Sequence, residues 1–396
     1  MSWFVFVESN TTGSGRRFCR VASDLGLRPL VLARDPHRYA FTAVDGVDVS
    51  PVDTGDLGAV LRHCADLPGR IEGIWSSSEY GVAVAAAAGR ALGLPGPSPD
   101  AVAACRDKVR QRAVLAAAGV PAPRWHVART ASDAVRAARA LGFPVVVKPP
   151  RESGSLGVRL CRDRPEVVAG FTAACHRGST LDTEVLVEEY VDGDEYSVEV
   201  FDGKAVGVTR KYLGAAPHFV ETGHDFPADV SAPDEAELVR VAEASAEALD
   251  LGWGPIHVEV RLTTSGASLI EVNPRLAGGM IPDLVLAASG VDLVDRTVRR
   301  AVGADPVTRP APGARASIRF VLAPRAGVVA GVSGLGEAER MPGVRAVHAS
   351  ARPGDPVVIT HSFRDRLGYA IATGDTAAAA ADRADAAARR IRVEIG

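Results

Sequence analysis

Lysine is scarce in this chain of 396 residues. Only four of its 45 basic side chains are lysine, namely Lys108, Lys148, Lys204 and Lys211, and the others are arginine. A genome that favours arginine and alanine codons explains the proportion, so the scarcity alone excludes no function. Under such a bias, however, a remaining lysine can mark a place that needs a compact point charge on a flexible stem rather than a planar guanidinium. Each of the four lysines is therefore a candidate for a specific role.

The chain also lacks an excess of positive charge, a long apolar run and closely spaced cysteines. Its net charge of −3 argues against a general nucleic-acid binder. No run of about 18 apolar residues occurs, so we expect no membrane span. The five cysteines contain no CxxC pair and are odd in number, as is typical of free thiols rather than of a disulfide framework or a zinc site. The sequence therefore predicts a cytoplasmic protein.

The composition is that of a folded protein, with 47% hydrophobic and 23% charged residues, and the length suggests two or three domains. The first hundred residues alternate short apolar runs with helical patterns, which predicts a parallel sheet with helices on its faces. The expected strands are Trp3–Val7, Pro29–Ala33 and Ile71–Trp75. The loop Asn10–Gly15 resembles a dinucleotide fingerprint, but Phe18 occupies the place of its last glycine, so we expect no dinucleotide there.

Beyond the first hundred residues, the sequence pattern predicts a compact αβ segment up to Val191 and a β-rich region after it. An Ala-rich helix is expected at the end. A helix is expected at Asp107–Ala118, and further helices are expected to fill Pro282–Ala301 before a Pro-rich linker at Pro306–Pro312. The fold class is thus α/β with α+β parts. The expected domains are 1–100, 101–191, 192–310 and 311–396.

The most specific local pattern is an acidic hairpin, with His257 and Glu259 before a turn centred on Ser265 and Glu271 and Asn273 after it. Because side chains alternate along strands, these four residues share one face, with Glu259 opposite Glu271. Val258, Val260, Ile270 and Val272 share the other, core-facing side. Facing carboxylates repel unless a positive charge lies between them. Carboxylate and amide oxygens suit Mg²⁺, so we interpret the pattern as a metal site, the alternative being a solvated polar face.

A second pattern joins an apolar strand that ends in Lys148 to a loop rich in glycine and serine. Glycines let backbone N–H groups approach phosphate oxygens closely. The missing G-K-[ST] and the strand that follows exclude a Walker P-loop, and a simple hairpin turn is the alternative for the loop alone. The loop residues in question are Ser153, Gly154, Ser155 and Gly157.

In this order the patterns resemble the ATP-grasp superfamily. The family has a lysine before the central domain, a strand lysine with a Gly-rich hairpin, an E-E-x-x-x-G-x-E hinge and an E…E-x-N-x-R metal site. Here these are Lys108, Lys148, Glu188–Glu195 and the set from Glu259 to Arg275. The resemblance covers Asp107 to Gly279 and implies an ATP-grasp fold, with a Rossmann-like domain before it, a central lid subdomain and a β-rich C-terminal region.

Within the superfamily, the segments around Glu221 and His224 and around Asn273–Ile281, together with the tail, resemble the L-amino-acid ligases. The resemblance implies that ATP and Mg²⁺, with Mn²⁺ as a substitute, serve as cofactors. The residues implied to bind the nucleotide are Lys108, Lys148, the four loop residues above, Glu188, Glu189, Val191 and Glu195, with Val191 at the adenine and Glu195 at the ribose. The implied metal ligands are Glu259, Glu271 and Asn273.

The implied catalytic and substrate-binding residues are Arg275 with the Gly278 and Gly279 backbone at the reacting acyl group, and Glu221 and His224 in the acceptor pocket. Lys211 lies on a strand that enters this pocket, where it either reaches phosphate or substrate or is purely structural. Lys204 follows a turn and is expected at the surface. Ser76–Glu79 is a further candidate for the substrate rim.

The resulting hypothesis is an ATP-dependent carboxylate–amine ligase that forms an amide or peptide bond through an acyl phosphate. The expected partners are a small carboxylate and an amine, in particular amino acids, and homodimers are common among such ligases. Two alternatives stay open. One is a biotin-carboxylase-like enzyme that forms carboxyphosphate, and the other is an ATP-binding regulatory protein without turnover, which the intact E…E-x-N-x-R set disfavours.

Overall fold

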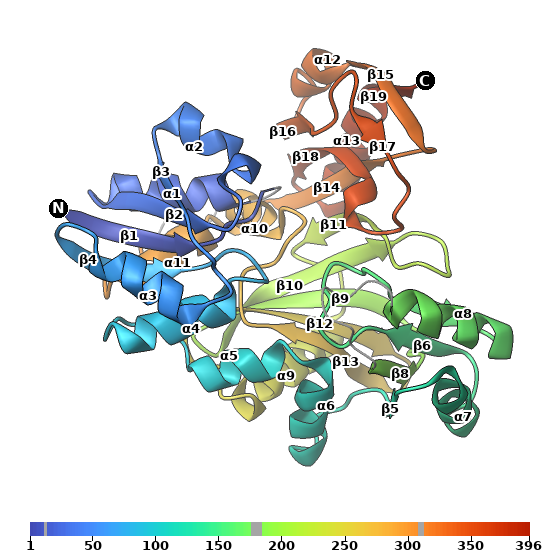
Figure 1. Ribbon diagram of the computed structural model, residues 1–396. Helices are drawn as coiled ribbons and strands as arrows, with labels where there is room; N and C mark the ends of the chain where they lie inside the picture. Colours follow the sequence, from blue (N-terminus) through green and yellow to red (C-terminus); the bar gives the residue numbers. More distant parts are fainter. Residues whose placement is uncertain (12–13, 176–183, 308–312) are drawn as a thin grey trace.

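The N-terminal part of the computed structural model is a parallel sheet in the order β3-β2-β1-β4 (Figure 1). The structure describes residues 1–11, 14–175, 184–307 and 313–396, so residues 12–13 of the Asn10–Gly15 loop and 308–312 of the expected linker lie outside it. The predicted parallel sheet is confirmed, and β3 and α2 are additions that the sequence patterns did not predict. The elements are β1 (Ser2–Val7), α1 (Gly15–Asp24), β2 (Arg28–Ala33), α2 (Ala40–Asp45), β3 (Asp48–Pro51), α3 (Leu57–Ala65), β4 (Arg70–Trp75) and α4 (Val82–Ala91).

A smaller antiparallel sheet, β5-β8-β6-β7, follows two linking helices and is drawn in green in Figure 1. Asp107 accepts hydrogen bonds from the backbone N–H groups of Val109 and Arg110 and so caps the helix that begins at Lys108. The elements are α5 (Pro99–Cys105), α6 (Lys108–Ala117), β5 (Trp125–Ala128), α7 (Ala131–Leu141), β6 (Val145–Lys148), β7 (Arg159–Cys161), α8 (Arg164–Cys175) and β8 (Val185–Glu189). We refer to this sheet and its helices α7 and α8 as the lid.

The largest sheet has the order β13-β12-β9-β10-β11-β14-β18-β16. Strands from the C-terminal region therefore continue the sheet that carries the acidic hairpin. Residues 221–226, which include the expected acceptor-pocket residues Glu221 and His224, form a strand at the centre of this sheet. The elements are β9 (Asp194–Phe201), β10 (Lys204–Leu213), β11 (Glu221–Phe226), α9 (Ala232–Ala248), β12 (Pro255–Thr263), β13 (Gly266–Asn273), α10 (Ile281–Ser289), α11 (Leu293–Ala301), β14 (Arg315–Leu322), β16 (Val344–Ala349) and β18 (Arg366–Gly374).

The chain ends in a strand, not in the expected helix. β19 (Arg392–Ile395) follows the Ala-rich helix α13 (Ala377–Arg390) and pairs with β15 (Gly327–Ser333), which also pairs with β17 (Pro356–Val357). The helix α12 (Leu335–Glu339) lies between β15 and β16. All five cysteines are free thiols. Among the described residues, no helix combines the length and the apolar character that crossing a membrane requires.

One hydrophobic core joins the N-terminal sheet to the large sheet. Phe18 of α1, Leu284 of α10, Val298 of α11 and Ile318 of β14 are buried in the same cluster. This packing fixes the carboxyl end of β4 beside the segment that follows β13. Side chains from distant parts of the sequence can therefore meet there in a defined geometry.

Candidate active site

The acidic hairpin has the predicted pairing at its functional end. His257 lies opposite Asn273 and Glu259 opposite Glu271. Beyond Glu259 the register shifts by one residue, so Val260 pairs with Leu269. The predicted turn position and the predicted burial of Ile270 are therefore wrong: Leu269 is fully buried, whereas Ile270 is only partly buried. The bulge removes Ile270 from the core-facing side of the hairpin. Glu259 and Glu271 still lie opposite each other, as predicted.

A lysine lies against each of the two carboxylates of the hairpin. Lys108 Nζ is 2.9 Å from Glu271 Oε1, and Lys211 Nζ is 2.8 Å from Glu259 Oε1. The mutual repulsion of the carboxylates therefore does not by itself require a metal ion. Among the described residues, no three acidic, histidine or cysteine side chains form a complete metal site. Two carboxylates and the buried Asn273 amide on one face nevertheless fit Mg²⁺, which takes its remaining ligands from water and phosphate.

The ammonium group of Lys211 lies at the centre of a cluster of three carboxylates. Its ammonium is 3.0 Å from Glu195, 3.1 Å from Glu221 and 2.8 Å from Glu259, and its side chain is 2% exposed. Burial disfavours the charged form, but the three carboxylates outweigh it and hold the pKa of Lys211 well above its ordinary value. Lys211 therefore stays a cation inside the candidate site.

Glu188 pairs with two buried cations, Lys148 and Arg112. The sequence patterns did not single out Arg112. Lys148 Nζ is 2.7 Å from Glu188 Oε2, and Arg112 Nε is 2.7 Å from Glu188 Oε1. Burial would raise the pKa of Glu188, but the two cations lower it to about 2. The Glu188 carboxylate is thus occupied by these partners, and only its backbone remains for a ligand.

The other hinge residues differ in position. Glu195 is buried and pairs with Arg261 at 3.1 Å, and Arg261 also donates to the backbone oxygen of Val191 at 2.7 Å. The carboxylate of Glu189, in contrast, points to Arg124 at the surface. The structure therefore brings Glu195 and Val191 to the candidate site but not the Glu189 side chain.

The Gly-rich loop forms the turn between the antiparallel strands β6 and β7, as the sequence predicts. Gly154 and Gly157 have φ values of 64° and 74°, and Ser155 has 62°. Lys108 donates two hydrogen bonds to the start of the loop. Its backbone N–H donates to the backbone oxygen of Pro150, and its Nζ donates to the backbone oxygen of Glu152 at 2.6 Å. Ser155 Oγ donates to the backbone oxygen of Phe219. Because Lys108 also pairs with Glu271, these contacts hold the loop over the hairpin. The backbone oxygen of Ser153 accepts from the backbone N–H of Leu156 within the loop.

The rim residue Glu79 reaches the centre of the site. Its carboxylate accepts hydrogen bonds from both Arg275 and Arg106 and is almost fully buried. Burial opposes the charge, but Arg275, Arg106 and Lys108 together lower the pKa of Glu79. Glu79 follows β4 and Arg275 follows β13, so this contact joins the N-terminal sheet to the hairpin. It also fixes the direction of the Arg275 side chain.

Changing Glu79 to Gln is expected to lower kcat roughly tenfold to a hundredfold, because a charge-assisted hydrogen bond to Arg275 is lost and the guanidinium can turn away. If the nucleotide implied by the resemblance binds at the lysines, its KM should change little, since among the described residues the ion pairs of Glu79 go to Arg106 and Arg275 and to no lysine. Steady-state kinetics with a substrate pair identified by the screen under Proposed function would measure both constants. Glu72→Gln is the matched control and should retain wild-type values, because Glu72 lies on β4 itself, where it is part-exposed beside Ser2. An unchanged kcat in Glu79→Gln would contradict a positioning role.

Glu221 and His224 lie on β11, opposite the end of β10 that carries Lys211. His224 is fully buried, with Nε2 3.3 Å from Glu221 Oε2. Burial lowers the pKa of His224, although Glu221 acts in the opposite direction. The imidazole is therefore neutral near pH 7 and can accept a proton. Gly279 packs against it with a φ of 58°, and a Cβ atom there would lie 2.6 Å from His224 Nε2.

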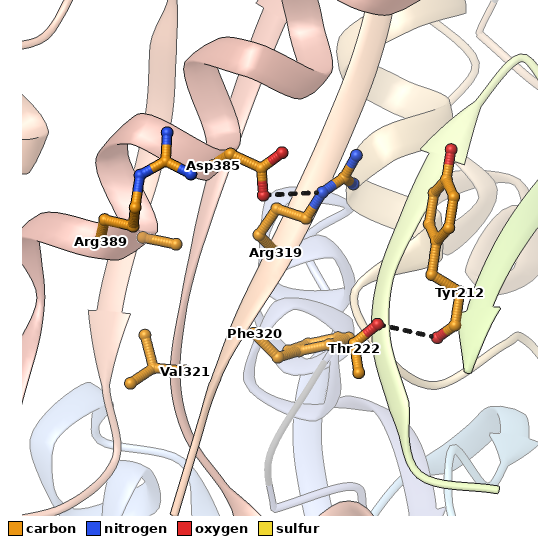
Figure 2. A pocket seen from close by; sticks show the side chains of 8 residues that line it. Tyr212, Thr222, Arg319, Phe320, Val321, Asp385 and Arg389 are labelled. Carbon is orange, nitrogen blue, oxygen red and sulfur yellow. Dashed lines mark hydrogen bonds and ion pairs between the residues drawn. The ribbon is translucent and has the colours of Figure 1, made fainter. Parts of the chain in front are cut away.

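A cavity of about 520 Å³ lies beside β10, β11, β14 and α13 (Figure 2). It is lined by Tyr212, Thr222 and Arg319, and by Asp385 from α13. Because side chains alternate, Tyr212 points away from the face that carries its neighbour Lys211. The Tyr212 side of this cavity therefore faces away from Lys211, whereas Phe320, which packs against His224, also lines the cavity.

Two family models match the chain. One is described as an ATP-grasp domain and matches residues 141–283, and the other as L-amino acid ligase C-terminal domain 2 and matches residues 319–396. An uncharacterized protein, y4rH, from Sinorhizobium fredii is 37% identical over 94% of this chain and 78% of its own length. Carnosine synthase 1 from Mus musculus is 28% identical over 76% of this chain but only 40% of its own, so the chain spans about two fifths of that relative.

Among solved structures, an L-amino acid ligase from Bacillus licheniformis superposes with a TM-score of 0.82. The match covers 100% of this chain and 98% of the other, at 20% sequence identity. The likeness at this identity concerns the fold. It extends over the N-terminal sheet, the lid and the large sheet alike.

Proposed function

The chain belongs to the ATP-grasp carboxylate–amine ligases, and from this premise we propose that it joins a small carboxylate to the amine of an amino acid through an acyl phosphate. The reaction would consume ATP and release ADP and phosphate. One observation carries the proposal: Glu259 and Glu271 lie directly opposite each other, with Lys211 and Lys108 at their carboxylates. Two acids flanked by flexible cations form an arrangement that can receive a metal–triphosphate complex.

The nucleotide would lie between the lid and the acidic hairpin. The phosphate oxygens would be contacted by Lys108, Lys148 and Lys211. The adenine would be bound by the backbone of Glu188 and Val191, and the ribose by Glu195. Mg²⁺ would be held by Glu259, Glu271 and Asn273 and, when bound, would neutralise phosphate charge. The Gly-rich loop, from Ser153 to Gly157, would cover the phosphates. The expected domains 1–100, 101–191, 192–310 and 311–396 are part of this proposal, with 101–191 acting as a closing lid.

The chain's own groups would then guide bond formation. Arg275 and the backbone N–H groups of Gly278 and Gly279 would stabilise the negative oxygen that develops as the amine attacks the acyl carbon. Glu221 would hold the incoming ammonium, and the neutral His224 would accept its proton. Closure of the lid would exclude water, which otherwise hydrolyses an acyl phosphate. Positioning and charge neutralisation supply the catalysis, without a covalent enzyme intermediate.

The proposal is tested by a screen for ADP and phosphate release with Mg²⁺ and ATP. Amino acids are offered singly and in all pairs, and products are identified by mass. We expect release that depends on an amine and a product that weighs the sum of the two substrates minus water. Release driven by bicarbonate without any amine would favour a carboxyphosphate-forming enzyme instead. No release with any pair would refute the ligase proposal.

A further inference from the structure

An arginine from the C-terminal region extends into the candidate acceptor pocket. Arg366, the first residue of β18, donates from one terminal nitrogen to Glu221 Oε2 at 2.6 Å. Its guanidinium lies 4.2 Å from the centre of the Phe320 ring, and its side chain is 13% exposed. Phe320 in turn packs edge-on against His224, with ring centres 5.4 Å apart. Arg366 is therefore part of the same pocket as Glu221 and His224, although 142 residues separate it from His224 in the sequence.

Two polar atoms in this cluster have no hydrogen-bond partner among the described residues. They are Nδ1 of His224 and Nε of Arg366, and both atoms are buried, whereas Nε2 of His224 lies 3.3 Å from Glu221 Oε2. Buried polar atoms in folded proteins nearly always have a partner. Unsatisfied atoms that gather in one place therefore point to a ligand that supplies hydrogen-bonding groups.

The imidazole of His224 and the guanidinium of Arg366 both lie beside Gly279. A Cβ atom on Gly279 would lie 2.6 Å from His224 Nε2 and 3.5 Å from a terminal nitrogen of Arg366. Gly279 belongs to the segment that would hold the reacting acyl group. The pocket thus presents an acid, a neutral imidazole and a guanidinium around one point next to that segment.

We propose that Arg366 binds the non-reacting α-carboxylate of an amino-acid acceptor while Glu221 holds its ammonium group. A zwitterion carries one group of each sign at a short separation, so it can replace the internal Glu221–Arg366 pair without leaving either charge buried and alone. A planar guanidinium also matches a carboxylate through two parallel hydrogen bonds. This inference rests on the proposed function and deepens it: the acceptor is an α-amino acid with a free carboxylate, and Arg366 is a specificity-determining residue.

The inference is tested by comparing each L-amino acid with its own α-amide as acceptor, with the carboxylate donor and MgATP held fixed. Wild-type protein should favour the acid over the amide in kcat/KM, and Arg366→Met should reduce this preference roughly tenfold to a hundredfold, because the charged partner is lost while the ring of Phe320 stays covered. The KM for ATP should remain unchanged. Arg364→Met, an exposed arginine two residues earlier, is the matched control and should keep the wild-type preference.

The alternative is that Arg366 only clamps β18 against β11. In that case Arg366→Met would lower the melting temperature and the activity toward acid and amide alike, and the unchanged ratio would overturn the inference. Arg366→Lys keeps the charge without the bidentate fork and should show an intermediate ratio, which provides a second reading if the methionine variant does not fold. A wild-type protein that releases ADP with amines but does not distinguish acid from amide would refute this inference alone. No amine-dependent release at all would refute the proposed function.

Discussion

Replacing Lys211 with methionine should cost about 3–5 kcal/mol of unfolding free energy and remove ligase activity. The ammonium is the shared partner of Glu195, Glu221 and Glu259. Methionine fills a similar volume but leaves the three carboxylates facing one another in a buried site. Glu195 and Glu221 keep Arg261 and Arg366, whereas Glu259 retains only His257 among the described residues. Urea denaturation at pH 7 would measure the loss.

The same strand offers a matched control. Lys204 begins β10, is 82% exposed and pairs with Glu243 at 3.2 Å. Lys204→Met should change stability by no more than about 0.5 kcal/mol, because exposed ion pairs contribute little. If Lys211→Met were as stable as Lys204→Met, the acidic cluster would not depend on its central cation.

The geometry around Lys211 also explains why arginine has not replaced it. An ammonium has three N–H donors that point in different directions, and three carboxylate oxygens lie 2.8 to 3.1 Å from it. A guanidinium is planar and larger, so it cannot direct one donor to each acid from the same point. The presence of a lysine at position 211 thus has a structural reason, whereas Lys204 lies at the surface, as predicted.

The paired carboxylates could be predicted because the signal is local. Alternation with a period of two placed Glu259, Glu271 and Asn273 on one face, and the structure agrees. The bulge between the hairpin strands could not be predicted, since it depends on which of Leu269 and Ile270 fits under α9. That choice is made by tertiary packing, and both residues are equally apolar in the sequence.

Contacts between distant segments were the least predictable part of the candidate site. Arg112, Arg366 and Glu79 complete it from α6, β18 and the end of β4. Glu79 lies 196 residues from Arg275, and Arg366 lies 145 residues from Glu221. An arginine in a chain rich in arginine gives no signal that it faces a pocket. Only the shared core between the N-terminal sheet and the large sheet brings these side chains together.

Glu271→Ala should abolish amine-dependent ADP release, because the change removes one of the two carboxylates that would hold Mg²⁺ and also the acidic partner of Lys108. Lys108 is 7% exposed, and Glu271 is its ion-pair partner. The variant therefore disturbs both the metal ligands and the lysine that would meet phosphate. A second reading is the rise in melting temperature that a non-hydrolysable ATP analogue with Mg²⁺ produces. A ligand at 100 times its Kd stabilises by about 2.7 kcal/mol, and the variant should lose most of this gain.

Glu237→Ala separates the effect of charge from that of position. Glu237 lies on α9 near the surface, where it pairs with Arg240 at 2.8 Å, so its loss changes the net charge by the same amount as Glu271→Ala. Glu237→Ala should keep both the ADP release and the stabilisation by the analogue. Glu271→Gln keeps the shape and an oxygen ligand but not the charge, so it should bind the analogue weakly and turn over slowly. Without Glu271, Mg²⁺ would have Glu259 as its single protein carboxylate, together with Asn273. Full activity in Glu271→Ala would therefore show that the hairpin carboxylates do not hold the metal of a bound nucleotide.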